Sequence, residues 1–142
     1  MLCNLTRKLI SISSVALFGF VLPGCSSAPV TSVHAIESTD RTAAEYFQQT
    51  PKNTLQTVII HDKLFIPTPI RTTIYVNGTA LGTVNQGEKL TFFVPPGVLR
   101  LSWSALGEGT YYREQEFIVS NESKNIFHLG TSGGVLRYIR EN

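Results

Sequence analysis

Residues 72–84 read TTIYVNGTALGTV, two runs rich in β-branched residues on either side of Asn77-Gly78. Both central residues of a type I′ turn need a positive φ, and asparagine and glycine tolerate that conformation better than other residues. The stretch therefore predicts a β-hairpin with strands at 72–76 and 79–84 and a type I′ turn between them.

Similar short runs flank this hairpin and are separated by turn signals such as Pro95-Pro96-Gly97. They cover residues 57–61, 90–94, 98–104, 111–119, 125–129 and 135–140. Seven or eight short strands at this spacing are typical of a β-sandwich or barrel. Because every link is short enough to join antiparallel neighbours, we predict a small antiparallel all-β sandwich.

Alternation within two of these runs predicts which side chains share a face. One run places Leu90, Phe92 and Val94 on one face, and the next run does the same with Leu99, Leu101 and Trp103. Side chains two residues apart on a strand share a face. Each set is therefore expected to share one face of its strand.

A short helix is predicted to precede the first strand, from Asp40 to Gln49. The Asp40 carboxylate can cap the first turn, and Pro51 disfavours helical backbone at the residue before it. Tyr46 and Phe47 are expected to pack on the domain.

The N-terminal residues have the pattern of an export signal. Arg7 and Lys8 precede 14 residues without charge, Leu9 to Leu22. As a helix these would span about 21 Å, which is short of the roughly 30 Å hydrocarbon core of a bilayer. This length favours a signal peptide at residues 1–24 over an uncleaved membrane anchor.

The segment Leu22-Pro23-Gly24-Cys25 follows directly and resembles the lipobox of bacterial lipoproteins. The resemblance implies that a diacylglyceryl group is attached to the Cys25 thiol. It also implies cleavage between Gly24 and Cys25 and a further acyl chain, such as palmitate, on the new amine. The alternative is a soluble exported protein in which Cys25 is unmodified.

The same resemblance predicts a location. Ser26 stands where enterobacterial lipoproteins retained at the inner membrane carry aspartate. We therefore expect the periplasmic leaflet of the cell outer membrane, with the inner membrane and the cell surface as alternatives. The polar residues 25–39 read as a flexible lipid-anchored linker, and residues 40–142 as the folded domain.

The hairpin region also resembles a known domain type. Its residues 74–78 and 81–84, Gly87 and residues 94–97 are similar to those of PEGA-like sandwich domains and of a related family of uncharacterised bacterial lipoproteins. The resemblance covers roughly residues 57–120. It implies a β-sandwich and brings no catalytic residue with it.

Composition excludes several classes of function. The chain has 142 residues, with 12 Lys and Arg against 10 Asp and Glu. This near balance argues against a basic nucleic-acid binder. Its two cysteines are too few for a disulfide scaffold or a cysteine zinc site, and Cys3 would leave with the signal peptide. No cofactor is predicted.

Candidate chemical groups are sparse. His34, His61 and His128 are too far apart for a metal-binding motif, and the latter two are expected to be partly exposed strand residues. Asp62 and Glu88 each precede a lysine and read as solvated surface. The Ser132-Gly133-Gly134 sequence is better explained as a hairpin turn than as a nucleophile elbow.

These observations predict a non-catalytic protein. It would be held by acyl chains on Cys25 and act as a structural or protein-interaction module with an envelope protein as partner. The alternative is a periplasmic glycan- or peptide-binding module, or an inhibitor of an envelope-attacking enzyme. That role would need an exposed aromatic patch, to which Tyr75, Tyr111 or Tyr138 could contribute. The polar-aromatic cluster with the best composition for ligand binding consists of Tyr111, Tyr112 and Arg113.

Overall fold

The computed structural model describes residues 28–64, 71–105, 114–132 and 135–142 of the chain. These residues contain nine β-strands and one short 3₁₀ helix. In chain order the elements are β1 (Ile36–Glu37), η1 (Ala44–Phe47), β2 (Leu55–His61), β3 (Thr72–Val76), β4 (Thr79–Val84), β5 (Glu88–Val94), β6 (Gly97–Ala105), β7 (Gln115–Val119), β8 (Ile126–Ser132) and β9 (Val135–Arg140).

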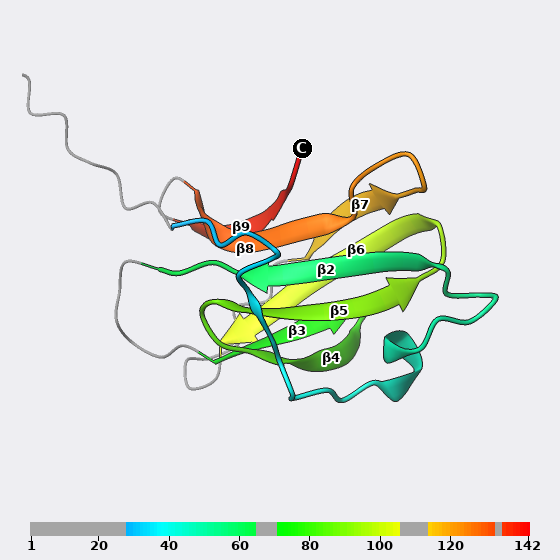
Figure 1. The fold of residues 1–142 in the computed structure, drawn as a ribbon, viewed down its shortest axis with the longest axis horizontal. Helices are drawn as coiled ribbons and strands as arrows, with labels where there is room; N and C mark the ends of the chain where they lie inside the picture. Colours follow the sequence, from blue (N-terminus) through cyan, green and yellow to red (C-terminus); the bar gives the residue numbers. More distant parts are fainter. Residues whose placement is uncertain (1–27, 65–70, 106–113, 133–134) are drawn as a thin grey trace, which may run out of the picture.

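The strands form two stacked sheets (Figure 1). The five-stranded sheet has the order β1-β5-β2-β8-β9, and the four-stranded sheet has the order β4-β3-β6-β7. Buried hydrophobic side chains from both sheets form one core cluster between them. The prediction of an all-β sandwich is therefore confirmed.

Local sequence patterns located the strands closely. Three of them, β3, β4 and β9, have the predicted bounds, and β2, β5, β6 and β8 each extend beyond the predicted run by one to three residues at an end. β7 begins at Gln115, and the first residues of the predicted 111–119 run lie outside the described residues. Alternating polarity over short segments was sufficient for this because each strand has one face in the core.

The two sets of side chains predicted to share a face are both buried in the core. Leu90, Phe92 and Val94 are at most 1% exposed, and Leu99, Leu101 and Trp103 are at most 7% exposed. The residues between them on β5, such as Thr91, are half-buried. We call the surface of each sheet that is turned away from the core its outer face.

The turn between β3 and β4 has the expected backbone. Asn77 has φ of 49° and Gly78 has φ of 81°, so both central residues lie in the left-handed region that a type I′ turn requires. Asn77 also links the turn to β6, because its side-chain oxygen accepts a hydrogen bond from the Arg100 amide at 3.0 Å.

The expectation of antiparallel neighbours throughout is wrong in two places. β8 runs parallel to β2, with Ile59 opposite Phe127, and β1 runs parallel to β5. The chain leaves β7 in the four-stranded sheet and crosses to the five-stranded sheet, where β8 takes the place beside β2 (Figure 1). The length of a link that crosses between sheets does not determine whether the next strand is parallel or antiparallel to its new neighbour. The sequence therefore could not reveal this pairing.

The helix predicted from Asp40 to Gln49 is reduced to η1, which has four residues. Asp40 does not cap it. Its carboxylate pairs with Arg71 at 3.3 Å, and its backbone oxygen accepts a hydrogen bond from the Thr83 amide at 3.2 Å. The extended residues before η1 satisfy backbone groups of β4, which competes with helix formation. Tyr46 and Phe47 pack against the core as predicted.

The described residues of the expected 25–39 linker are packed on the domain. We call residues 28–38 the N-terminal segment; it crosses the front of the five-stranded sheet in Figure 1. Within it, Ile36 and Glu37 form β1, and Ala35 and Ser38 are only 6% and 5% exposed. Pairing satisfies the edge of β5, which would otherwise present free backbone groups to solvent.

The chain after this segment continues along the edge of β4, so it joins the two sheets. The Ser38 hydroxyl donates to the Thr83 carbonyl at 2.7 Å, and Arg41 forms a β-bridge with Gly82. A Cβ atom at Gly82 would collide with the backbone oxygen of Asp40. Glycine is therefore required here for close backbone approach, and no positive φ is involved.

A glutamine side chain links the other pair of sheet edges. The Gln115 side-chain oxygen accepts a hydrogen bond from the Tyr138 amide at 2.7 Å, and its side-chain nitrogen donates to the Tyr138 carbonyl at 3.3 Å. This amide therefore contacts the backbone of β9 much as a neighbouring strand would. The Tyr138 hydroxyl also crosses the core and donates to the Ser102 carbonyl at 3.0 Å.

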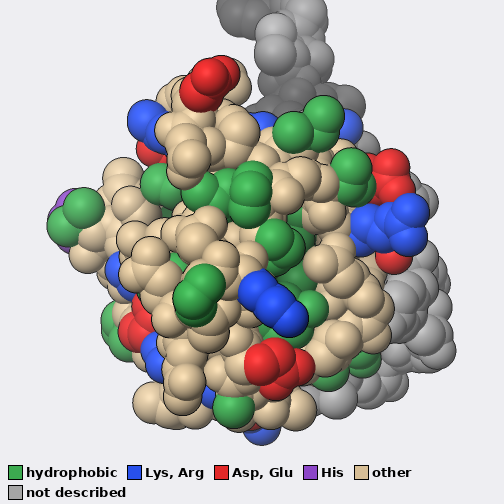
Figure 2. Space-filling view, turned by 90° about the vertical axis from the view of Figure 1, so that its right-hand side faces the viewer, with side chains coloured by type: hydrophobic (Ala, Val, Ile, Leu, Met, Phe, Trp, Pro, Cys, Tyr) green, Lys and Arg blue, Asp and Glu red, His purple; other side chains and the backbone are tan. Residues whose placement is uncertain are grey.

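Figure 2 views the molecule from the end that carries the β3–β4 and β5–β6 turns. Hydrophobic side chains there are scattered among polar and charged ones, so this end has no continuous apolar surface (Figure 2). Within residues 28–142, wherever the chain is described, no helix has the length and apolar character needed to cross a bilayer.

Candidate functional site

The predicted lipidation site precedes the described part of the chain. Leu22, Pro23, Gly24 and Cys25 all lie outside the described residues, so the structure leaves that prediction as it stands. The first described residue is Ala28, which exchanges two backbone hydrogen bonds with Lys63, of 2.8 and 3.2 Å. The chain is therefore held in place three residues after Cys25 by hydrogen bonds to a residue just beyond the end of β2.

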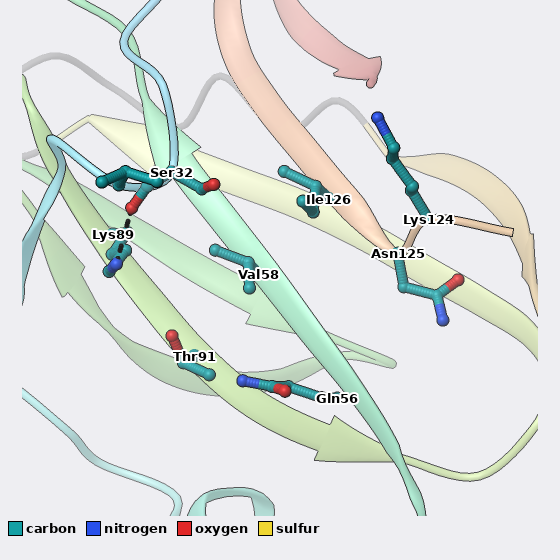
Figure 3. Close-up of a pocket in the computed structure, with 9 residues that line it drawn as sticks. Ser32, Gln56, Val58, Lys89, Thr91, Lys124, Asn125 and Ile126 are labelled. Atoms are coloured by element: carbon teal, nitrogen blue, oxygen red, sulfur yellow. Dashed lines mark hydrogen bonds between the residues drawn. The ribbon is translucent and has the colours of Figure 1, made fainter. Parts of the chain in front are cut away.

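The N-terminal segment is held by polar contacts with the five-stranded sheet. The Val30 amide donates to the Asp62 carboxylate at 3.0 Å. Further along, the Lys89 ammonium donates to the Ser32 carbonyl at 2.7 Å (Figure 3). These contacts place the segment on the outer face of the sheet, over β2 and β5.

A groove of about 440 Å³ lies beside this segment (Figure 3). Val58 and Ile126 contribute apolar surface, and Gln56, Thr91, Lys124 and Asn125 contribute polar groups. Several of these polar groups already bind other parts of the chain. The Thr91 hydroxyl donates to Glu37, and the Asn125 side chain donates to the Ser120 carbonyl. A ligand in this groove would therefore contact mainly apolar side chains, because some of the polar groups are already hydrogen-bonded within the protein.

Two carboxylates contact His128 from opposite sides of its ring. Nδ1 lies 2.9 Å from an oxygen of Asp62, and Nε2 lies 3.4 Å from an oxygen of Glu141. The Asp62 side chain is 4% exposed and the His128 side chain is 13% exposed, so solvent screens the first contact weakly. A cavity of about 310 Å³, which Pro29 and Ile139 also line, opens beside this cluster.

The hydrogen bond that the His128 ring donates to Asp62 raises the pKa of His128 above its ordinary value, and partial burial opposes this in part. The hydrogen bond from His128 in turn lowers the pKa of Glu141. Acceptors at both ring nitrogens favour the doubly protonated imidazolium. The two carboxylates therefore favour the protonated ring, and each ring nitrogen has a carboxylate as its hydrogen-bond partner in this arrangement.

His61, expected to be partly exposed, is completely buried. It follows the inward-facing Thr57 and Ile59 on β2, so the sheet directs its ring into the core. Burial lowers the pKa of His61, and the backbone of Val84 offsets this only in part. Neither ring nitrogen has a hydrogen-bond partner of good geometry among the described residues. His61 therefore remains neutral near pH 7.

The expectation of solvated surface is wrong for Asp62 and incomplete for Glu88. Asp62 is 3% exposed, because the N-terminal segment and His128 cover it. Glu88 is half-buried and accepts two hydrogen bonds from Asn85, which closes the β4–β5 turn. The Asp62–His128 contact spans 66 residues and depends on the parallel β2–β8 pairing. No local sequence signal could have revealed it.

The remaining candidates are dispersed or lie elsewhere. Tyr138 is 2% exposed and cannot join an exposed aromatic patch, whereas Tyr75 is half-buried on the outer face of the four-stranded sheet. Tyr111, Tyr112 and Arg113 lie outside the described residues. Ser132 pairs with Val135, so β8 and β9 form the hairpin that was predicted around residues 132–134.

No group of three His, Cys, Asp or Glu side chains in the described part of the chain is arranged to hold a metal ion. The three members of the His128 cluster cannot do so, because the carboxylates bind opposite ring nitrogens. Comparison of the chain with protein-family models, curated proteins and solved structures finds no match.

Proposed function

We propose that this protein is a lipid-anchored protein of the cell envelope whose β-sandwich serves as a non-catalytic structural or protein-interaction module. One sequence observation carries the proposal. Leu22-Pro23-Gly24-Cys25 follows an uncharged segment of signal-peptide length with Arg7 and Lys8 ahead of it. The described fold, which starts at Ala28, is compatible with a chain that begins at an acylated Cys25.

The polar groups of the outer face support a role without catalysis. Lys89, Thr91 and Asn125 bind other parts of the chain, and His128 is occupied at both ring nitrogens. These contacts stabilise the fold and leave no aligned nucleophile and base in that region. We also propose membership of the PEGA-like type of sandwich, on the basis of the Asn77-Gly78 hairpin and the all-β fold.

Ser26, next to the proposed acylated residue, makes the periplasmic leaflet of the outer membrane the proposed location. Several acyl chains on one residue are enough for firm membrane attachment, because each buried methylene contributes about 0.8 kcal/mol. No basic patch would be needed for attachment itself.

Mass spectrometry of the mature N-terminus tests the anchoring. We expect a chain that starts at Cys25 and carries acyl groups. Cys25→Ala should abolish acylation and processing, whereas Cys3→Ala is the matched control and should leave both intact, because Cys3 lies in the segment that is removed. An unmodified Cys25 thiol in the mature protein would contradict the proposal.

The groove beside the N-terminal segment favours one second candidate, which is binding of a peptide from an envelope partner (Figure 3). Val58 and Ile126 would contact apolar side chains, and the exposed Gln56 amide would bind peptide backbone. Affinity purification from envelope extracts with wild type and Val58→Glu distinguishes this candidate, because a groove-bound partner would be lost from the variant only.

A further inference from the structure

The distance between the proposed lipid and the domain is unusually short. Only Ser26 and Ser27 separate Cys25 from Ala28. Each residue spans at most about 3.6 Å, so the Cα atoms of Cys25 and Ala28 lie no more than about 11 Å apart. Ala28 is hydrogen-bonded to Lys63 on the domain. The headgroup layer of one leaflet is about 5–8 Å thick, so this end of the domain must lie at the headgroups.

The residues around Ala28 have a composition that suits a lipid surface. We call Ala28, Pro29, Lys63, Arg137 and Ile139 the anchor face. Pro29 and Ile139 line the same cavity, and Ile139 is 40% exposed although it is a large hydrophobic residue. Arg137 is exposed and lies two residues before Ile139 on β9, so both side chains are on the outer face. Lys63 is a second exposed cation, although its side chain approaches Gly87 rather than β9, and the carboxylates of Asp62 and Glu141 line the same cavity as Pro29 and Ile139.

We propose that the anchor face rests on the headgroups of the leaflet that holds the acyl chains of Cys25. This inference rests on the proposed lipid anchor and adds an orientation to it. The exposed Ile139 suits the boundary of the acyl chains, and the exposed Arg137 on the same strand suits anionic headgroups. The five-stranded sheet near β9 would face the membrane, and the far end of the four-stranded sheet would face away from it.

Fluorescence quenching in vesicles tests this orientation. The acylated protein is reconstituted in vesicles of phosphatidylethanolamine and phosphatidylglycerol, with and without nitroxide-labelled lipid. Cys25 would be blocked by lipid, so one introduced cysteine can be labelled selectively in the mature chain. The test position is Ile139→Cys, and Arg137→Cys is a second position on the same face. Val98→Cys is the control, because Val98 is 61% exposed and lies at the start of β6 in the four-stranded sheet, next to the β5–β6 turn.

We expect quenching at positions 139 and 137 to be at least twofold stronger than at position 98. Equal quenching at all three positions, or stronger quenching at position 98, would overturn the orientation. Vesicle flotation and the mass of the N-terminus are measured on the same samples. A protein that is acylated and floats but shows no preference refutes only the orientation, whereas a protein without acyl groups refutes the anchor and the orientation together.

Discussion

Two histidines on neighbouring strands show how strongly the surroundings of one residue determine its charge. His128 lies on the outer face of the five-stranded sheet between two carboxylates, and its pKa is raised. His61 lies on the adjacent β2 with its ring in the core, and burial lowers its pKa. The two residues therefore contribute to stability with opposite dependence on pH.

The folded-state pKa of His128 is higher than its ordinary value of 6.5. Its stabilising contribution should therefore be complete below about pH 6.5 and should be lost as the pH rises through the raised pKa. We expect the difference in free energy of unfolding between wild type and His128→Gln to be largest near pH 6 and to shrink toward pH 8.5. Urea unfolding across this pH range measures the difference. Because both proteins contain His61, its opposite contribution cancels when the two free energies are subtracted.

Gln56→Ala is the control, because Gln56 has no titratable group and is exposed on the outer face of the same sheet. Its difference from wild type should stay constant over the same pH range. A constant difference for His128→Gln as well would show that the Asp62 contact does not favour the protonated ring.

At the scale of the elements, side-chain hydrogen bonds join both pairs of neighbouring sheet edges. On one side, the Ser38 hydroxyl, which follows β1, donates to the Thr83 carbonyl of β4 at 2.7 Å. On the other side, the Gln115 amide joins β7 to the backbone of β9. An unpaired strand edge tends to recruit other chains, and these contacts cover part of two such edges.

Gln115→Ala should destabilise the protein by about 1–3 kcal/mol, because it removes two hydrogen bonds worth roughly 0.5–1.5 kcal/mol each. The measurement is urea unfolding, where the midpoint should fall and the slope should stay unchanged. Gln56→Ala is the control on the exposed outer face and should change stability by less than about 0.5 kcal/mol. Equal effects of the two substitutions would show that the Gln115 contacts add nothing to stability.

At the scale of the molecule, the N-terminal segment belongs to the fold. Ile60 is completely buried, yet it lies outside the core cluster and points to the outer face that this segment crosses. Burying one isoleucine side chain contributes about 1.5–3 kcal/mol. The segment therefore covers apolar surface in addition to pairing with β5.

The sequence predicted that residues 40–142 would fold without the preceding residues. From the structure we expect this shorter chain to melt about 10 °C below residues 28–142, because it exposes Ile60 and the edge of β5. Thermal unfolding followed by circular dichroism compares the two chains. Equal melting temperatures would mean that the N-terminal segment contributes no stability and is effectively a linker.

The sequence by itself determined the elements whose signals are local. The Asn77-Gly78 turn, the alternation of Leu90, Phe92 and Val94, and the bounds of β9 each depend on a few adjacent residues, and all are as predicted. These three features follow from backbone preferences and from the need to bury one face of a strand. Lipidation of Cys25 also depends on adjacent residues and stays a prediction.

Only the tertiary structure decided how distant segments meet. The parallel pairing of β2 with β8 brings Asp62 to His128, and the close approach of Asp40 requires glycine at position 82. Residues 28–38 have little apolar periodicity, so their composition indicated a linker, but free strand edges and the exposed side of Ile60 recruit them. Free backbone groups are paired, and apolar surface is covered, by whichever segment the topology places nearby. A local sequence pattern does not show which segment that will be.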